Sequence, residues 1–421
     1  MTAKKARKEA HLIMLAMIAG FIIGLVLHFT GTGVVADYLK PIGTVFIRCL
    51  KMVIIPLVFS SIFMSMINLG TPEALGSMGR KAVGYYFVTT AIAVLFGLIF
   101  VNMINPGVGA DLGTEGLSAL STQMAERVQS QEGLFKTIMG VIINAFPTNP
   151  FGAMADGNIL QVIVFAIFLG IVALYNPKKS ESFTKVMASL EDMSLALTHV
   201  IMKFAPLGVF VLMLGVLVKS GTGAIVSLSK YMATVLIGLL CHAGFLMCVA
   251  VVRSKKSPMY ILKGLSGALT TAFSTSSSAA TLPITMANVE ENLGVDKKTA
   301  KFVLPLGATI NMDGTALYES VAAIFIAQAY GIHLGLGQQV IVFLTASLAA
   351  IGAAAIPGAG LITMSIVLSA VGLPLEGIGL ILAVDRILDM FRTTVNVFGD
   401  AVGTMVVDAA MKKRVSRHKQ N

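Results

Sequence analysis

Long apolar runs separated by short polar segments make up the pattern of this chain. A helix needs roughly 20 apolar residues to cross a bilayer, and six runs approach or exceed that length: 11–29, 42–69, 82–104, 158–175, 193–218 and 231–252. A shorter run, 134–146, ends at Pro147 and indicates an interfacial or broken part of the next span. The first run has no small-residue cleavage site, so we expect no cleavable signal peptide. The pattern predicts an all-α polytopic membrane protein.

The pattern changes after residue 256, where two apolar stretches are interrupted at their middle by small and helix-breaking residues. The first is Thr271–Ile284 (TAFSTSSSAATLPI) and the second is Ala350–Thr363 (AIGAAAIPGAGLIT). Pro and Gly break helices, and Ser competes for backbone hydrogen bonds. Non-helical backbone at membrane depth is tolerated only where protein or a watery cavity satisfies it. We therefore predict two re-entrant helical hairpins with their tips inside the membrane.

Each predicted hairpin precedes a helix with polar groups, and the two units share one spacing. Ser278 and Asp313 are 35 residues apart, as are Pro357 and Arg392. The first unit starts on the basic side of the membrane and the second on the opposite side, so together they form an inverted repeat. Secondary transporters build such repeats around a site at the bilayer midplane. The spacing thus favours a transporter.

The most polar part of the last apolar region is Asp385–Asp400 (DRILDMFRTTVNVFGD). On an α-helix, groups that can bind ions would share one stripe about 80° wide, formed by Asp385, Asp389, Arg392, Asn396 and Asp400. Intramembrane charges mark functional sites by default, although ion pairs that hold a bundle together are the structural alternative. Arg392 suits a carboxylate, which a guanidinium binds in a bidentate manner. Asp389 would face a cationic group, so the pair suits an amino acid with an extra carboxylate.

A second polar group, Asn311-Met-Asp313-Gly-Thr315, lies between the two predicted hairpins. Residues at i and i+2 do not share a helical face, and Gly314 lies within the group, so we predict an unwound turn. Such a turn would expose carbonyl and side-chain oxygens together. These are hard ligands, suited to Na⁺ or another hard cation.

The two hairpin tips have separate functional interpretations. Exposed N–H groups at Ser276–Ser278 would suit an anion, and a Ser-rich turn without a ligand is the alternative. Small residues around Pro357 suit a gate next to a site, and a flexible loop is the alternative.

Other polar residues of the spans have structural interpretations. From their spacing alone, Tyr86, Thr89 and Thr90 would bond to their own helix or to a neighbouring one. His242 is expected to be packed rather than metal-bound. The cysteines lack metal-ligand spacing, and we expect small buried hydrophobes at Cys49, Cys241 and Cys248.

Composition supports the membrane interpretation, since 56% of the 421 residues are hydrophobic and only 12% are charged. Soluble domains carry about twice that charged fraction. The net charge of +10 could indicate a nucleic-acid partner. However, most Lys and Arg lie in short clusters on alternate connections and at the termini, whereas the longest loop, 105–135, carries acidic residues. This positive-inside pattern argues for no nucleic acid and places both termini in the cytoplasm.

The motifs SSSAATLP, NMDGT, IPGAG and DxxxDxxRTxxNVxGD together resemble those of the dicarboxylate/amino acid:cation symporter family, the glutamate and aspartate transporters of archaea, bacteria and animals. The resemblance covers essentially the whole chain. It implies eight transmembrane helices plus two re-entrant hairpins, a homotrimer in membrane lipid, and an elevator motion that carries Na⁺ and substrate. It also implies scaffold spans at 1–81 and 131–220, a third span and extracellular loop at 82–130, and the rest of the transport domain at 221–421.

The resemblance further implies the site residues. The substrate would bind at both tips, the seventh span and the last helix, through Ser276, Ser277, Ser278, Thr315, Ile356, Pro357, Gly358, Ala359, Gly360, Asp389, Arg392, Thr393 and Asn396. One sodium site would use Asp400 with the carbonyls of Gly307, Asn311 and Asn396. A second, which reverses the structural interpretation of the third span, would use Tyr86, Thr89, Thr90, Asn311 and Asp313. A third would use the backbone of Thr309, Ala350, Ile351 and Ala353.

The chain departs from the family pattern at an arginine. Archaeal members typically have one at the position of Ser276 and animal members at that of Met390, whereas this chain has neither. Arg386 lies one turn before Met390, so its guanidinium could reach the same space.

We therefore expect a Na⁺-coupled symporter of aspartate, glutamate or both in a cytoplasmic membrane. A C4-dicarboxylate symporter is the closest alternative, but Asp389 would repel a substrate without an ammonium group. A neutral amino acid would leave Arg392 unpaired. Proton coupling is another alternative, although the carboxylates and the Thr89–Thr90 pair favour Na⁺. An intramembrane hydrolase would need a base near Ser276–Ser278, and no His lies near these motifs.

Overall fold

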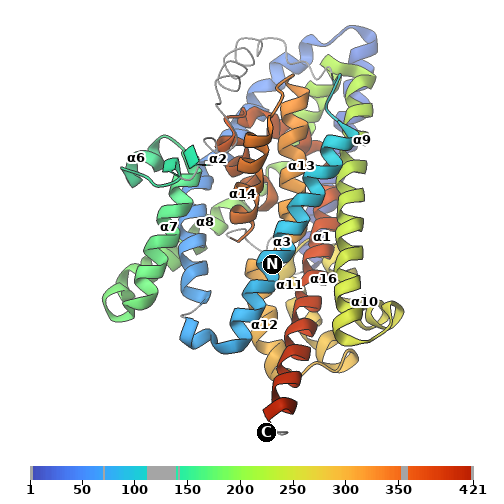
Figure 1. The fold of residues 1–421 in the computed structure, drawn as a ribbon. Helices are drawn as coiled ribbons and strands as arrows, with labels where there is room; N and C mark the ends of the chain where they lie inside the picture. Colours follow the sequence, from blue (N-terminus) through green and yellow to red (C-terminus); the bar gives the residue numbers. More distant parts are fainter. Residues whose placement is uncertain (1–2, 70–71, 111–138, 141–142, 352–358, 419–421) are drawn as a thin grey trace.

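The structure is a computed structural model (Figure 1), and it describes residues 3–69, 72–110, 139–140, 143–351 and 359–418. Every regular element within these ranges is a helix. Most of the helices run along one common direction (Figure 1). The prediction of an all-α polytopic chain is therefore confirmed at this level.

The first three helices cover the first three predicted apolar runs. They are α1 (Ala3–Thr30), α2 (Val34–Leu69) and α3 (Pro72–Ile104). In the described part of the chain, three helical segments are long and apolar enough to cross a membrane: Val34–Asn68, Gly76–Ile104 and Ile225–Ser254. Shorter apolar helices lie at Ile18–Thr30, Leu160–Tyr175 and Leu336–Ile351. The predicted count of eight spans stays a prediction.

The next helices flank α2 and carry a correction. They are α6 (Pro150–Ala155), α7 (Ile159–Tyr175) and α8 (Pro177–Met202), and α7 and α8 both pack on α2. The apolar run 193–218 is not one helix, because α8 ends at Met202 and the chain bends by 57° before the next helix. Pro206 explains the break, since its ring clashes with the carbonyl four residues earlier. Most of the predicted segment 134–146 lies outside the described residues.

A long helix, α9 (Ala205–Ser254), follows and contains a break of its own. Gly221 has non-helical angles of φ 52° and ψ −132°, a conformation that glycine adopts without steric penalty. A side chain there would also collide with the ring of His28 on α1. The break lies beside the predicted domain boundary between residues 220 and 221, which stays a prediction.

Two pairs of packed helices lie in the segments predicted as hairpins, and their re-entrant arrangement stays a prediction. The first pair is α10 (Pro258–Thr275) and α11 (Ser278–Ala287), which continues as the π-helix η1 (Asn288–Asn292). The second pair is α14 (Leu336–Ile351) and α15 (Ala359–Ala370), followed by the 3₁₀ turn η2 (Leu375–Gly377). The tip of the second pair, 352–358, lies outside the described residues.

The centre of the molecule is α13 (Asp313–Ala329), which is buried along almost its whole length. It packs against α3, α9, α14, α15 and the last helix, α16 (Ile378–His418). The helix before it, α12, spans Lys297–Ile310, so Asn311 and Met312 form a non-helical connection. The predicted unwound turn is confirmed for Asn311 and Met312, which lie in the interior, but Asp313, Gly314 and Thr315 belong to the first turn of α13.

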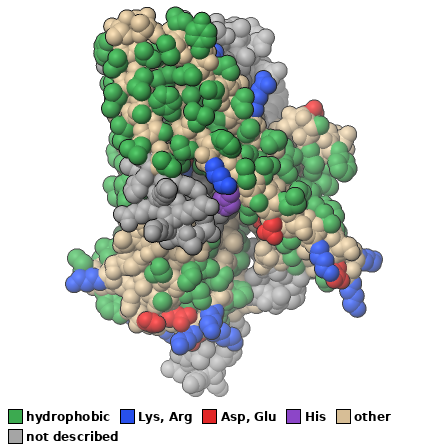
Figure 2. All heavy atoms as spheres, turned by 180° about the vertical axis from the view of Figure 1, so that it is seen from behind, with side chains coloured by type: hydrophobic (Ala, Val, Ile, Leu, Met, Phe, Trp, Pro, Cys, Tyr) green, Lys and Arg blue, Asp and Glu red, His purple; other side chains and the backbone are tan. Residues whose placement is uncertain are grey.

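The outer surface is strongly apolar. On the face in Figure 2, hydrophobic side chains cover the upper part, and most of the visible charged side chains lie in the lower part. The prediction of buried cysteines is wrong for Cys241 and Cys248, which are exposed on α9, and Cys49 is half-buried. The two exposed cysteines are seven residues apart and so share one outward helical face.

Candidate functional site

The polar stripe of α16 is buried in the interior of the chain. Its five predicted members are between 1% and 6% exposed, and Thr393 beside them is also buried. All lie on one continuous helix, so the stripe exists as predicted. Its contacts divide it into an Arg392 end and an Asp400 end.

Arg392 is held on several sides. Its Nη1 lies 3.1 Å from Asp385 Oδ1, and its Nη2 donates to Asp389 Oδ1 at 2.9 Å. Its Cζ lies 3.8 Å from the centre of the Tyr318 ring on α13, a cation–π arrangement. Its Nε is buried without an acceptor among the described residues. A buried donor without an acceptor is costly, so this guanidinium suits an additional anionic group.

The start of α15 lies directly against this guanidinium. A Cβ atom added at Gly360 would be 2.7 Å from Arg392 Nη1, so only glycine lets the backbone come this close. Ala359 begins the same helix. The other predicted members of this tip, Ile356, Pro357 and Gly358, lie outside the described residues.

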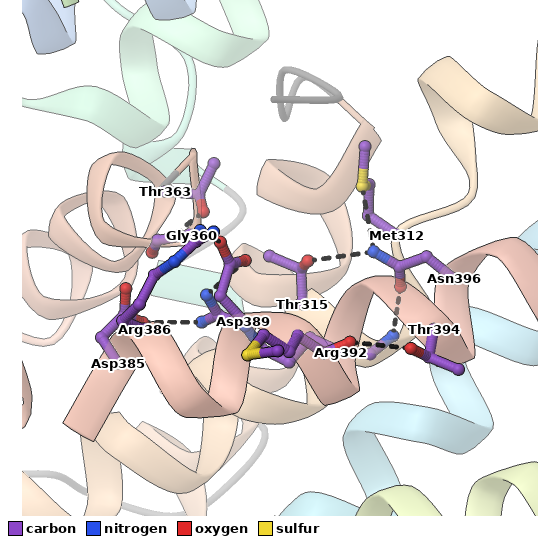
Figure 3. Close-up of polar contacts among 12 residues, drawn as sticks. Met312, Thr315, Gly360, Thr363, Asp385, Arg386, Asp389, Arg392, Thr394 and Asn396 are labelled. Carbon is purple, nitrogen blue, oxygen red and sulfur yellow. Dashed lines mark hydrogen bonds and ion pairs between the residues drawn. The ribbon is translucent and has the colours of Figure 1, made fainter. Parts of the chain in front are cut away.

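Asn396 connects α16 to the first turn of α13 (Figure 3). Its Oδ1 accepts from the backbone N–H of Gly314 at 2.7 Å, and its Nδ2 donates to Thr315 Oγ1 at 3.3 Å. The same Nδ2 is 3.3 Å from Met312 Sδ. The unwound turn and the stripe are thus joined through one amide side chain.

The serine tip of the first hairpin is also buried. Ser276 ends α10 in the left-handed conformation, with φ 49°, and its Oγ has no partner among the described residues. Ser277 caps α11 by accepting from the N–H of Ala280, and Ser278 is the first residue of that helix. Phe273 of α10 packs edge-on against Phe391. The tip therefore lies on a helix that contacts α16 beside Arg392.

The Asp400 end brings together the first predicted sodium set. Asn311 Nδ2 donates to Asp400 Oδ1 at 2.9 Å and to the carbonyl of Asn396 at 3.3 Å. A Cβ added at Gly307 would lie 2.7 Å from Asp400 Oδ1, which places these residues side by side. Asn311 Oδ1 is buried and has no partner within the described chain. Oxygen atoms of this kind fit a hard cation.

The second predicted sodium set is brought together in part. Thr90 Oγ1 donates to Asp313 Oδ1 at 2.6 Å. Thr89 instead donates to the carbonyl of Tyr86 at 3.2 Å, and the Tyr86 hydroxyl to the carbonyl of Val303 at 3.3 Å. All three bonds, within α3 or to a neighbouring helix, match the structural interpretation. The sodium site implied by the resemblance stays a prediction.

The structure describes three of the four residues in the third predicted sodium set. Thr309 has an exposed side chain whose Oγ1 donates to the carbonyl of Leu306 at 2.9 Å. Ala350 is buried and Ile351 half-buried at the end of α14, a helix that contacts α12. Ala353 lies outside the described residues.

Three residues of the site were not predicted. His242 Nε2 is 3.0 Å from Asp313 Oδ2, and both side chains are fully buried, so the expectation of a packed histidine is right but incomplete. Tyr318 and Glu319 on α13 are also fully buried. An acidic residue within an apolar helix is a signal that could have singled out Glu319.

The donor set excludes some kinds of metal site within the described chain. No group of three or more His, Cys, Asp or Glu side chains there could hold a metal ion. The oxygens at the Asp400 end belong instead to single carboxylates, amides and carbonyls, which suit an alkali cation better than a transition metal.

A buried guanidinium that faces carboxylates, close to a non-helical turn between helices of a polytopic chain, is an arrangement that secondary transporters use. A model of the sodium:dicarboxylate symporter family matches residues 10–410, and the chain belongs to this family. It is 37% identical to an excitatory amino acid transporter of Caenorhabditis elegans, over 97% of this chain and 89% of the relative. It is also 37% identical to excitatory amino acid transporter 3 of Homo sapiens, over 89% of this chain and 80% of the relative.

Proposed function

We propose that the protein imports L-aspartate, L-glutamate or both by Na⁺-coupled symport. The observation that carries the proposal is the Arg392 end of the stripe, where one buried guanidinium and the Asp389 carboxylate lie 2.9 Å apart. A substrate with opposite charges about a helical turn apart matches this pair. The names of the relatives support the same substrate class.

The contacts support one binding mode. The side-chain carboxylate of the substrate would bind Arg392, whose Nε has no acceptor in the described chain. Its ammonium group would bind Asp389, and its α-carboxylate the N–H groups and hydroxyls of Ser276–Ser278. Thr315, Thr393 and Asn396 would border the ligand, and the tip Ile356–Gly360 would cover it.

Sodium ions would bind at the Asp400 end. Asp400, Asn311, Gly307 and Asn396 are adjacent and supply oxygen atoms. A second ion would bind between Thr90, Asp313 and their neighbours. Each charge moved inward through 100 mV releases about 2.3 kcal/mol, which can drive uptake of an anionic substrate. The coupling requires that Na⁺ and substrate favour the same state, which makes their affinities reciprocal.

The finer architecture belongs to the same proposal. Two helix pairs act as re-entrant hairpins, and the transport domain (82–130 and 221–421) moves as an elevator against a trimeric scaffold (1–81 and 131–220). Supporting features are the break at Gly221 and the packing of α7 and α8 on α2, apart from the central helix α13. Both termini lie in the cytoplasm.

Uptake into proteoliposomes tests the function. Labelled aspartate would enter when Na⁺ is outside and would not enter when K⁺ replaces it, with K⁺ inside in both cases. Uptake that ignores Na⁺ but follows a proton gradient would contradict the proposal. Glutamate and succinate, offered as unlabelled competitors, would rank the substrates.

A further inference from the structure

Asp389 lies between two guanidinium groups of its own helix. Arg392 Nη2 is 2.9 Å from its Oδ1, and Arg386 Nη1 is 3.4 Å from its Oδ2 (Figure 3). Both arginines are three residues away along α16, on opposite sides of the aspartate. The carboxylate that would receive the substrate's ammonium group therefore already has a second positive group at its other oxygen.

The charges around this carboxylate are formally balanced. The cluster holds two aspartates, Asp385 and Asp389, and two arginines, Arg386 and Arg392. Asp385 pairs with the other guanidinium, through Arg392 Nη1 at 3.1 Å. An ammonium group that binds Asp389 therefore competes with Arg386 for the same anion.

The two arginines differ in how firmly they are held. Arg392 is 1% exposed, makes two ion pairs and lies on the Tyr318 ring. Arg386 is 12% exposed, its ion pair is longer, and its Nε has no acceptor in the described chain. Among the described residues, a single ion pair at 3.4 Å holds the Arg386 head group, and the long arginine stem lets that head group move without a shift of the helix. Arg386 is thus the arginine of this cluster whose guanidinium can move away from Asp389.

We propose that Arg386 is the resident counter-ion of Asp389, which the ammonium group of an amino-acid substrate displaces and which stays in place for a ligand without that group. The proposal rests on the proposed function, because it needs Asp389 as the ammonium site. It makes Arg386 a specificity-determining residue that sets the penalty for a missing amino group.

The consequence concerns dicarboxylates. Succinate has the two carboxylates of aspartate but no ammonium, so by itself it would bring a second anion towards Asp389. With Arg386 in place, that carboxylate keeps a positive neighbour, and the repulsion is reduced. Without Arg386, aspartate still supplies its own cation, whereas succinate supplies none. Loss of Arg386 should therefore penalise succinate more than aspartate.

The test compares two ligands on one protein. Dissociation constants of aspartate and succinate are measured by calorimetry on the full chain in lipid nanodiscs, at saturating Na⁺. The wild type is expected to bind succinate measurably, and more weakly than aspartate. In Arg386→Gln, the ratio of the succinate constant to the aspartate constant should rise by about tenfold or more, the scale of a partly buried charge pair.

Matched variants separate this role from a general structural one. Arg386→Lys keeps a positive charge and should hold the ratio within about threefold of the wild type. Asp389→Asn should lower the ratio, because the repulsion of succinate is removed, and adding Arg386→Gln to it should change the ratio little. Arg386→Met keeps the stem and repeats the test if the glutamine variant does not fold.

The outcomes are distinct. An equal change for both ligands in Arg386→Gln, or no detectable binding of succinate by the wild type, would overturn the role of Arg386 while leaving the proposed function intact. Failure of the wild type to bind aspartate in Na⁺ would instead overturn the proposed function.

Discussion

The carboxylates at the two ends of the α16 stripe have different kinds of partner. At the Arg392 end, each carboxylate lies beside a guanidinium. At the Asp400 end, Asp400 accepts from an amide, and Asp313 is bonded to a threonine and a histidine. Within the described chain, no Lys or Arg pairs with either of these two carboxylates. One end thus matches a ligand that carries both signs, whereas the other end is where we propose that a mobile cation binds.

The first prediction concerns the arginine that would bind the substrate carboxylate at the Arg392 end. Arg392→Gln should lower the initial rate of Na⁺-driven aspartate uptake by at least about a hundredfold, because breaking a buried ion pair costs about 3–5 kcal/mol and the substrate loses its anion site. Rates are measured in proteoliposomes with equal protein content. Arg253→Gln, at an exposed arginine of α9, should transport normally. Uptake near the wild-type rate in the Arg392 variant would show that this end does not bind the substrate.

The second prediction removes charge from the other end. Asp400→Asn should raise the Na⁺ concentration for half-maximal uptake by about tenfold or more, since a buried carboxylate is the strongest cation ligand there. The matched control is Asp408→Asn, at a buried carboxylate two turns further along the same helix. Asp408 pairs with Lys412 and accepts from the N–H of Asp296, so this variant should change the value little. If both variants raised the half-maximal Na⁺ concentration equally, the Asp400 end would not be a specific Na⁺ site.

The third prediction tests the contact between the second helix pair and Arg392. Gly360→Ala places a methyl group 2.7 Å from Nη1, so either the helix or the guanidinium must move. We expect the affinity for aspartate to fall about tenfold, a cost of the size seen for overpacking, in a titration at saturating Na⁺. Gly335→Ala, where the added atom meets open space, is the control. Unchanged affinity would mean that α15 is not part of the binding surface.

The smallest expected effect concerns His242, which orients Asp313. His242→Ala removes the contact at 3.0 Å and should raise the Na⁺ requirement about threefold, whereas His242→Gln keeps a donor and should stay closer to the wild type. Cys241→Ala, on the exposed face of the same helix, should have no effect. The measurement is the Na⁺ dependence of uptake, and a shift in the aspartate affinity alone would assign His242 to the other end.

Local patterns made much of the interior predictable. The stripe followed from helical spacing, and the unwound turn at Asn311 followed from polar residues that no single face could hold. These features depend on near neighbours in sequence. The bend at Met202 could also have been read from Pro206, but the long apolar run concealed it.

Contacts between distant segments were not predictable from the residues. His242 and Asp313 are 71 residues apart, and nothing in the sequence of α9 indicates which helix its inner face meets. For the same reason the outward face of Cys241 and Cys248 was predicted as buried, because apolar residues at a lipid boundary resemble those of a protein core.

Asn396 belongs to both ends at once, since its side chain bonds the first turn of α13 and its carbonyl accepts from Asn311. A carrier that moved with only one end loaded would dissipate the ion gradient without delivering solute. The side-chain amide and the backbone carbonyl of this one residue make these contacts, so a shift of α16 at Asn396 changes both ends together. Asn396 is therefore where we expect slippage to begin: Asn396→Ala should let Na⁺ efflux proceed without solute, although each ligand still has most of its own contacts.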